Sequence, residues 1–480
     1  MKNATLVWLR HSLRLRDHPA LVDAAEHGAV VPVFVWAPEE EGEWPPGDAA
    51  QWWLHHALQD LDERLRARGS RLILRTGPTL DALRDCLEAT GADRVVWNRR
   101  YEPTLAARDA EVRDALEAQG IETQVFESQI LHDPTAVETT SGGPYHVFTP
   151  FWKKVRKENL LDTGPPLNIP DLPVPETWPA SEPLEALELL PEMRGEPDWT
   201  GGLRDAWTPT IDGAHDRLDY TLEHVLGDYD TARDRPDRDG TARLSPYLHH
   251  GQLSPRQVWH TVARWADDTG RHDDARPFLR QIVFREFAFH WLYHYPETPT
   301  ETYRDKFRAF PWRDDAEAVS RWKRGQTGYP IVDAGMRQLY ETGWMHNRVR
   351  MIVASFLTKD LMVHWRHGAR WFWDTLVDAD LASNTFNWQW TAGCGADAQP
   401  FFRIFNPVSQ SERYDPDGAY IRRYVPELSD LPDDAIHAPW EESDARLRAL
   451  GVSLGETYPR PIVDHAEARE EALAAYERVK

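Results

Sequence analysis

The chain has 480 residues, 41% of them hydrophobic, and a formal net charge of −23. Because domains usually hold about 100–200 residues, this length predicts two or three domains with ample material for buried cores. Its two cysteines, Cys86 and Cys394, exclude a disulfide scaffold and a four-cysteine zinc or iron–sulfur site. Since no apolar run is long enough to span a membrane and no signal segment opens the chain, we expect a cytoplasmic protein.

The acidic balance argues against a polyanionic partner, but the charge is unevenly distributed. Only 8 lysines stand against 47 arginines. Residues 301–370 carry 13 basic and 8 acidic side chains, whereas the stretches 1–300 and 371–480 are net acidic. This distribution favours a local anion-binding face in the second half of the chain over a basic tail.

The first 130 residues alternate between strand-like and helix-like patterns. Five short segments are typical of buried strands: Thr5–Leu9, Val30–Trp36, Arg71–Arg75, Arg94–Trp97 and Glu122–Leu131. Helical periodicity lies between them, for example in Ala50–Arg68 and Leu105–Gln119. The alternation predicts a doubly wound parallel sheet, and no glycine-rich phosphate-binding motif accompanies it.

A proline-rich connector follows this α/β part. Nine of the 36 prolines fall between residues 160 and 200, which excludes a continuous helix or a central strand there. Beyond Gly202 the patterns are helical. We therefore expect an α/β domain over residues 1–132, a connector over 133–202 and a large all-α domain over 203–480.

Two segments of the second half suggest ligand binding. After Gly240, small and hydroxyl residues open a predicted helix beside Arg243, where free N–H groups could bind a phosphate or be capped by a side chain. If the chain is helical from Trp344 onward, four residues share one face: Trp344, Asn347, Arg348 and Met351. That face suits the lining of a polar and aromatic cavity, and a core helix with polar edges is the alternative.

A third segment, Val377–Pro407, is too polar for a plain core and too aromatic for an ordinary loop. It includes Asp378, Asp380, Asn384, Trp388 and Trp390. Paired carboxylates suit acid–base or metal chemistry. An ion pair with Arg350 explains them equally well.

Long collinear motifs are spread along essentially the whole chain. They read WLRHSLRLRDHPAL, PYHVFTPFWKKV, DGTARLSPYLHHGQLSPRQ, TGYPIVDAGMRQLYETGWMHNRVRMIVASFL, DLASNTFNWQW and FFRIFNP. In these motifs the chain resembles the DNA photolyase/cryptochrome family, most closely the class I cyclobutane pyrimidine dimer photolyases. The resemblance implies a helical FAD-binding domain beside an α/β antenna domain, and light-driven repair of UV-damaged DNA by reduced FAD in a monomer that does not bind membranes.

The resemblance also implies roles for individual residues. The positions that match FAD-binding residues are Tyr229, Thr241, Ala242, Arg243, Leu244, Ser245, Phe278, Arg285, Trp344, Asn347, Arg350, Asp378, Asp380 and Asn384. Trp388, Trp365 and Trp312 match a chain that conducts electrons between flavin and surface. The positions that match residues facing DNA or the lesion are Arg233, Gln281, Phe284, Asn347, Arg348, Met351, Trp390 and Arg403.

Two of these positions depart from the repair pattern. Gln281 replaces a glutamate and Phe284 a tryptophan, which favours a cryptochrome-like photoreceptor as the alternative function. Asn384 favours repair, because sensory members mostly carry aspartate or cysteine there. A (6-4) or single-strand-specific photolyase is a further alternative. A second antenna chromophore is expected, and Thr104 and Leu105 disfavour folate without identifying another pigment.

Overall fold

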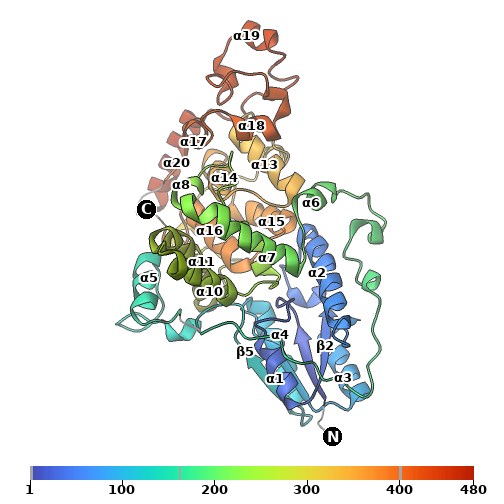
Figure 1. Cartoon of the computed structure of the whole chain (residues 1–480). Coiled ribbons are helices and arrows are strands. Elements are labelled where there is room, and N and C mark those ends of the chain that lie inside the picture. Colours follow the sequence, from blue (N-terminus) through green and yellow to red (C-terminus); the bar gives the residue numbers. More distant parts are fainter. Residues whose placement is uncertain (1–3, 162–163, 399–402) are drawn as a thin grey trace. The chain divides into compact units, whose positions relative to one another are not determined.

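The computed structural model describes residues 4–161, 164–398 and 403–480 (Figure 1). The chain forms two compact units. The first unit comprises Met1–Gly227, Ala242–Pro296 and Val377–Ala382, and the second comprises Asp228–Thr241, Glu297–Leu376 and Ser383–Lys480. The domain bounds expected from the sequence stay a prediction.

A five-stranded parallel sheet lies in the first unit, with strand order β3-β2-β1-β4-β5. Its strands are β1 (Ala4–Leu9), β2 (Ala29–Trp36), β3 (Ile73–Thr76), β4 (Arg94–Asn98) and β5 (Glu122–Phe126). All five predicted strands are therefore present, which confirms the doubly wound α/β part. Two bounds were predicted too generously: β5 ends at Phe126, and β3 begins at Ile73 because the Leu72 N–H donates to Asp62 instead of a neighbouring strand.

Helices cover both faces of this sheet. On one face, α3 (Thr79–Thr90) and α4 (Pro103–Glu117) pack on alternate strand residues in a core that includes Leu6, Trp8 and Trp97. The helix α1 (Pro19–His27) contacts the strands as well, and α2 (Asp48–Arg66) is the longest helix of this part. Because adjacent strand residues alternate between faces, both sides of the strands are apolar, as a parallel sheet requires.

The remaining chain is helical, as predicted. The first unit continues with η1 (Pro38–Glu41), η2 (Pro134–Ala136), α5 (Phe148–Lys157), η3 (Leu184–Leu187), η4 (Pro191–Arg194), α6 (Gly201–Ala206), α7 (Ile211–Tyr220), η5 (Thr221–Val225), α9 (Ser245–His249), α10 (Pro255–Thr269) and α11 (His272–His294). Between residues 164 and 200, the described part of the proline-rich stretch holds only the short turns η3 and η4, since proline interrupts longer helices.

The second unit is built from short helices. They are α8 (Tyr229–Ala232), η7 (Asp305–Ala309), α12 (Ala316–Lys323), α13 (Pro330–Thr342), α14 (Asn347–Ser355), η8 (Phe356–Asp360), α15 (Trp365–Thr375), α17 (Pro407–Tyr414), α18 (Ala419–Tyr424), η9 (Pro426–Leu428), η10 (Pro439–Glu441), α19 (Asp444–Ala449) and α20 (His465–Val479). The turn η6 (Leu226–Asp228) and the helix α16 (Leu381–Ala392) each continue from the first unit into the second.

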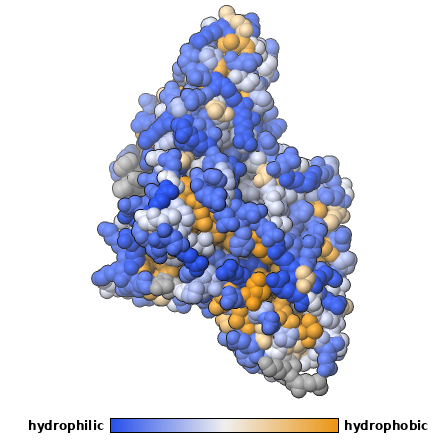
Figure 2. Space-filling view, in the orientation of Figure 1, coloured by the Kyte–Doolittle hydropathy of each residue, from blue (hydrophilic) through white to orange (hydrophobic). Residues whose placement is uncertain are grey.

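Two observations complete the outline of the fold. Hydrophilic residues dominate the face of the molecule seen in Figure 2, as the composition leads one to expect. None of the helices in the described part of the chain combines the length and hydrophobicity that a bilayer crossing requires.

Buried neutral histidines tie the stability of the first unit to pH. The His18 ring is 1% exposed and accepts a hydrogen bond from the Leu21 N–H at 3.0 Å at the start of α1. Burial, with Arg14 adding to it, lowers the pKa of His18 to about 3, and burial lowers the pKa of His249 to about 4 and of His290 to about 3. Each imidazole stays neutral in the folded state while the unfolded chain takes up protons below about pH 6.5.

We predict that the free energy of unfolding falls as the pH drops from about 6.5 towards 4, because the unfolded state then binds more protons than the folded state. His18→Asn keeps an oxygen that can accept the Leu21 N–H but does not titrate. Urea unfolding at several pH values should therefore show a shallower acid dependence for His18→Asn. An unchanged slope would contradict a neutral His18 in the folded protein.

Candidate functional site

In the first unit, the short helix α9 brings a hydroxyl to a carboxylate. Ser245 begins α9, and its Oγ donates to Asp378 Oδ2 at 2.6 Å. The predicted helix start is confirmed, but capping by a side chain is wrong for α9: the residue before it is Leu244, which makes no side-chain cap. Arg243 adopts a φ of 48°, which is uncommon for a residue with a Cβ. The turn before α9 is thus held in an unusual conformation.

The predicted carboxylate pair lies near the start of α16. Asp378 and Asp380 are 8% and 7% exposed. Buried carboxylates need hydrogen-bond donors, and the Ser245 hydroxyl supplies one of them. In the described ranges no group of three or more His, Cys, Asp or Glu side chains could hold a metal ion.

One face of α11 presents the predicted cofactor and lesion residues. Phe278, Gln281 and Arg285 follow each other at helical spacing, and Phe278 is 3% exposed. The Gln281 amide donates to the Pro277 carbonyl at 3.3 Å. Arg285 Nη1 donates to the Gln129 carbonyl at 2.7 Å, whereas its Nη2 is buried without a hydrogen-bond partner in the described residues.

The Phe284 ring is already stacked within the protein. Its centroid lies 3.5 Å from that of Phe148, the first residue of α5, with 11° between the planes. The Arg280 guanidinium carbon lies 5.3 Å from the Phe148 ring centroid and 5.5 Å from that of Phe284. The sequence predicted that Phe284 faces the DNA or the lesion and did not reveal either neighbour, although Phe148 stands within a quoted motif. One face of the ring is therefore covered.

In the second unit, α14 begins later than predicted. The His346 ring accepts a hydrogen bond from the Arg348 N–H at 3.2 Å and caps a helix whose first residue is Asn347. Trp344 precedes the helix and is 6% exposed. The prediction that Trp344 shares a helical face with the others is therefore wrong, because the His346 cap starts the helix after it.

The three remaining residues of that face do lie together. Asn347 is exposed, and Arg348 and Met351 are half-buried. The Met351 sulfur lies 4.0 Å from Asn347 Nδ2 and 3.9 Å from Arg348 Nη1, both of which donate to it. Arg348 also donates to Asp234 at 2.8 Å and lies 4.4 Å from the ring centroid of Tyr414. This partly open, polar patch is unlike a core helix face.

Asn384 lies on α16 with its carboxamide turned toward α15. The residue is 9% exposed, and its Nδ2 donates to the Ala369 carbonyl at 2.9 Å. Further along α16, Trp390 Nε1 donates to the Asp397 carbonyl at 3.2 Å. The hydrogen bond to α15 fixes the orientation of the Asn384 amide.

The three predicted electron-transfer tryptophans lie in the second unit. Trp388 and Trp365 are 3% and 0% exposed, and Trp312 is half-buried. The His364 ring lies between two of them, with its centroid 5.2 Å from that of Trp312 and 5.5 Å from that of Trp365. Burial lowers the pKa of His364 to about 4, so this ring is neutral at neutral pH. The sequence had given no reason to single out His364.

The indole of Trp388 packs tightly on a glycine of α15. A Cβ at Gly368 would lie 2.0 Å from the nearest ring carbon of Trp388. The Trp388 ring also contacts Phe372, with centroids 5.0 Å apart, and Trp322, with centroids 6.2 Å apart. A side chain at position 368 would displace the indole.

The remaining predicted residues have contacts of their own. Tyr229 is buried, which raises its pKa to about 12, and the Arg233 guanidinium lies 5.6 Å from its ring centroid. The Ala242 carbonyl accepts a hydrogen bond from Arg217 at 2.8 Å. Arg403 is exposed, and its carbonyl accepts a hydrogen bond from Lys359 at 3.3 Å. The other predicted cofactor residues are Thr241 and Arg350; the latter donates to the Met345 carbonyl at 2.8 Å.

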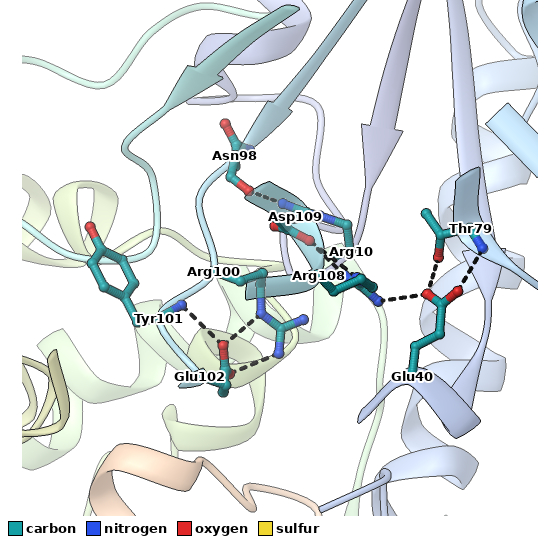
Figure 3. A network of polar contacts seen from close by, with 9 residues as sticks. All are labelled: Arg10, Glu40, Thr79, Asn98, Arg100, Tyr101, Glu102, Arg108 and Asp109. Carbon is teal, nitrogen blue, oxygen red and sulfur yellow. Dashed lines mark hydrogen bonds and ion pairs between the residues drawn. The ribbon is translucent and has the colours of Figure 1, made fainter. Parts of the chain in front are cut away.

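The carboxyl ends of β1 and β4 form the switch point of the sheet, where doubly wound folds usually bind ligands. Charged residues fill it (Figure 3). Arg10 pairs with Asp109 at 2.7 Å, and Arg100 pairs with Glu102 at 2.7 Å, with all four side chains at most 10% exposed. In each pair, the guanidinium and the carboxylate compensate each other's charge.

Comparison with known proteins gives the family. Residues 5–176 match the family described as DNA photolyase, and residues 278–478 match the FAD binding domain of DNA photolyase. A deoxyribodipyrimidine photo-lyase of Agrobacterium fabrum is 49% identical, covering 99% of this chain and 98% of the relative. The chain belongs to the DNA photolyase/cryptochrome family.

Relatives of both kinds are similar along the whole chain. Cryptochrome-2 of Arabidopsis thaliana is 39% identical, covering 100% of this chain and 80% of the relative. The crystal structure of a bacterial class III photolyase from Agrobacterium tumefaciens is 48% identical, with a TM-score of 0.95, covering 100% of this chain and 98% of that one. These relatives support photolyase-type DNA repair, while the class I resemblance stays a prediction.

The residues present fit the FAD that this family's domain binds. In the first unit, the buried Arg285 Nη2 offers an unsatisfied cationic donor on the same helix as the apolar Phe278. A buried cationic donor of this kind suits the carbonyl or phosphate oxygens of a nucleotide cofactor. The chain therefore has an FAD-binding domain, and the individual contacts belong to the proposal below.

We predict that Gly368→Ala slows photoreduction of the flavin, because the new methyl group moves the Trp388 indole. Overpacking of this kind typically costs about 1–3 kcal/mol of stability. Absorbance under blue light with an external reductant measures the rate, and thermal unfolding measures the stability. Gly201→Ala, which adds the same methyl group where the nearest atom is 3.8 Å away, serves as the control. Wild-type photoreduction and stability in Gly368→Ala would contradict the tight packing.

Proposed function

We propose that this protein repairs cyclobutane pyrimidine dimers in UV-damaged DNA with light and reduced FAD. The observation that carries the proposal is the position of Asn384: a buried, neutral carboxamide held by α15, on the same helix as Trp388. An amide can donate or accept a hydrogen bond without adding charge, which suits a reduced flavin ring. The sequence similarity to deoxyribodipyrimidine photo-lyases supports the same activity.

The proposal assigns the cofactor residues by their chemistry. When bound and reduced, FAD would supply the electron that opens the dimer. Arg285 would donate to an oxygen of the cofactor through its buried Nη2. The Ser245 hydroxyl holds Asp378 in a fixed orientation, so this carboxylate can accept a hydrogen bond from a ring N–H or a hydroxyl.

The tryptophans would return the cofactor to its active state. Trp365 is fully buried and donates to the Thr302 hydroxyl at 3.3 Å, which fixes its ring. Trp312 is half-buried and so can be reduced from solvent. With Trp388 they provide aromatic rings from the core of the second unit toward its surface.

The patch on α14 would bind the lesion. Photolyases extrude the damaged bases from the duplex, at a cost that is smallest where stacking is already weakened. Asn347 offers an amide to pyrimidine carbonyl and imide groups, while Met351 offers an adaptable apolar surface. Arg348 is held by Asp234 and Tyr414 and supplies a positive charge at its edge.

A photoreceptor is the second candidate. Gln281 cannot carry the negative charge of a glutamate, and one face of the Phe284 ring is covered by Phe148. Both observations argue for weaker binding of a pyrimidine dimer. The plant cryptochrome is also similar over the whole length of this chain. A light-driven change in the flavin without repair would favour this function.

The test is light-dependent dimer loss. The purified, FAD-loaded and reduced protein is incubated with oligonucleotides that carry one cyclobutane thymine dimer, in duplex and in single-stranded form, and with a (6-4) photoproduct. We expect blue light to remove the dimer and dark samples to retain it. If the dimer is not lost with reduced flavin, the photolyase assignment is overturned. If only the (6-4) photoproduct is lost, the assignment of the cyclobutane dimer as the substrate is overturned.

We also propose a second light-harvesting chromophore. Buried ion pairs such as Arg10–Asp109 occupy the switch point of the sheet. A ring system that binds there would have to contact these side chains or displace them. An archaeal photolyase from Sulfolobus tokodaii, described as holding two FAD molecules, is 30% identical with a TM-score of 0.82. An absorption spectrum of the purified protein after the flavin is bleached would reveal any second pigment.

We predict that Gln281→Glu raises the affinity for dimer-containing DNA or the repair yield per photon. Position 281 is half-buried on the α11 face that carries Phe278 and Arg285, so a carboxylate there could bind the imide groups of the lesion. Fluorescence titration in the dark and repair under calibrated light measure the two quantities. Gln281→Met, of similar size, is the control and should lower both. Equal values for all three proteins would place Gln281 outside the lesion pocket.

A further inference from the structure

Lysine is rare in this acidic chain, yet it is concentrated at one place. Three of the eight lysines lie in one five-residue stretch of α5: Lys153, Lys154 and Lys157. Arg156 lies in the same stretch. The roles assigned above use none of these residues. A short helix with four basic side chains in a protein of net charge −23 is a local exception that calls for an anionic partner.

The helix separates these charges from its apolar side. Phe148, Phe151 and Val155 are buried, and the Phe151 ring packs against Phe287 of α11 with centroids 5.1 Å apart. The apolar side is therefore used within the first unit. An anionic membrane is a poor match for α5, because a helix that binds a bilayer needs its apolar side free for the lipid.

The opposite side of α5 carries the basic residues. Lys153, Arg156 and Lys157 are exposed and stand at positions i, i+3 and i+4, which places them on one face of the helix. Glu158, the acidic residue that follows, is paired with Lys154 at 2.6 Å. The Arg156 guanidinium lies 5.2 Å from the Trp152 ring centroid, so a flat aromatic surface accompanies the charges.

The helix that carries this basic face begins beside Phe284, one of the residues predicted to face the lesion. Phe148 at the N-terminal end of α5 stacks on Phe284, and the exposed Arg280 lies over both rings. From Phe148, the basic residues follow after five to nine residues, or about 8–14 Å along the helix axis. Duplex DNA advances about 3.4 Å per base pair, so this length corresponds to about two to four base pairs.

We propose that the exposed basic face of α5, formed by Lys153, Arg156 and Lys157, binds the phosphate backbone of duplex DNA beside the lesion. The inference rests on the proposed function, because Phe284 marks the lesion only if this chain binds damaged DNA. Contacts of this kind set the position of the duplex without reading its sequence. They also compensate for an acidic protein that would otherwise repel DNA.

The experiment compares the FAD-loaded full chain with K153Q/R156Q/K157Q in the dark. The control variant R66Q/R68Q/R71Q removes the same charge from exposed arginines at the end of α2 and after it. Binding is measured to a duplex with one thymine dimer, to the same duplex without damage, to the isolated dimer dinucleotide, and to phosphatidylserine vesicles. Salt is varied between about 0.05 and 0.2 M.

We expect K153Q/R156Q/K157Q to bind both duplexes about tenfold more weakly, with the slope of log affinity against log salt smaller by about 2–3, since each phosphate contact contributes about 0.9. K157Q alone should show about one third of the change in slope. The dimer dinucleotide lacks flanking phosphates and should bind the wild type and the variant equally. The control variant should behave as the wild type.

Three results would overturn the proposal. Wild-type duplex affinity and slope in K153Q/R156Q/K157Q would show that α5 does not touch DNA, and an equal loss for the dinucleotide would show that the substitutions act on the pocket. Loss of vesicle binding alone would assign the face to a membrane. Failure of the proposed function is seen separately, as absence of light-dependent dimer loss in the wild type.

Discussion

The close approach of α15 and α16 is the constraint on which the candidate redox site depends. Gly368 leaves room for the Trp388 indole, and the carbonyl of the next residue, Ala369, accepts the Asn384 amide. Two neighbouring residues of α15 thus fix the two side chains of α16 to which the proposed function assigns roles in flavin chemistry. Trp365 opens the same α15, so the crossing also sets the position of the next tryptophan.

Much of the fold followed from elementary patterns. Continuous apolar runs identified the parallel strands because both faces of such a sheet are buried. Proline density predicted a stretch without long helices or central strands, since proline interrupts both helix and ladder. Element bounds were harder, as at Leu72, whose N–H is taken by Asp62 across ten residues of sequence. A local pattern does not show such a partner.

The site was predictable where chemistry stands in the motif itself and unpredictable where it depends on packing. The grouping of Asn347, Arg348 and Met351 follows from helical spacing alone. Trp344 was misplaced because the His346 ring, rather than a hydroxyl or carboxylate, begins α14. His364, Gly368 and Phe148 came to notice only through their neighbours in space, which a single sequence does not reveal.

The stack of Phe284 on Phe148 has a consequence for the entropy of binding. An aromatic side chain that is free in solution loses rotamer freedom when a ligand arrives, at a cost of about 0.5–1.5 kcal/mol. Here the ring is ordered during folding, by a neighbour on another helix and by the Arg280 cation. Under the proposed function, the Phe284 ring would therefore meet its ligand preorganised, and this rigidity would offset part of the contact area that it lacks relative to tryptophan.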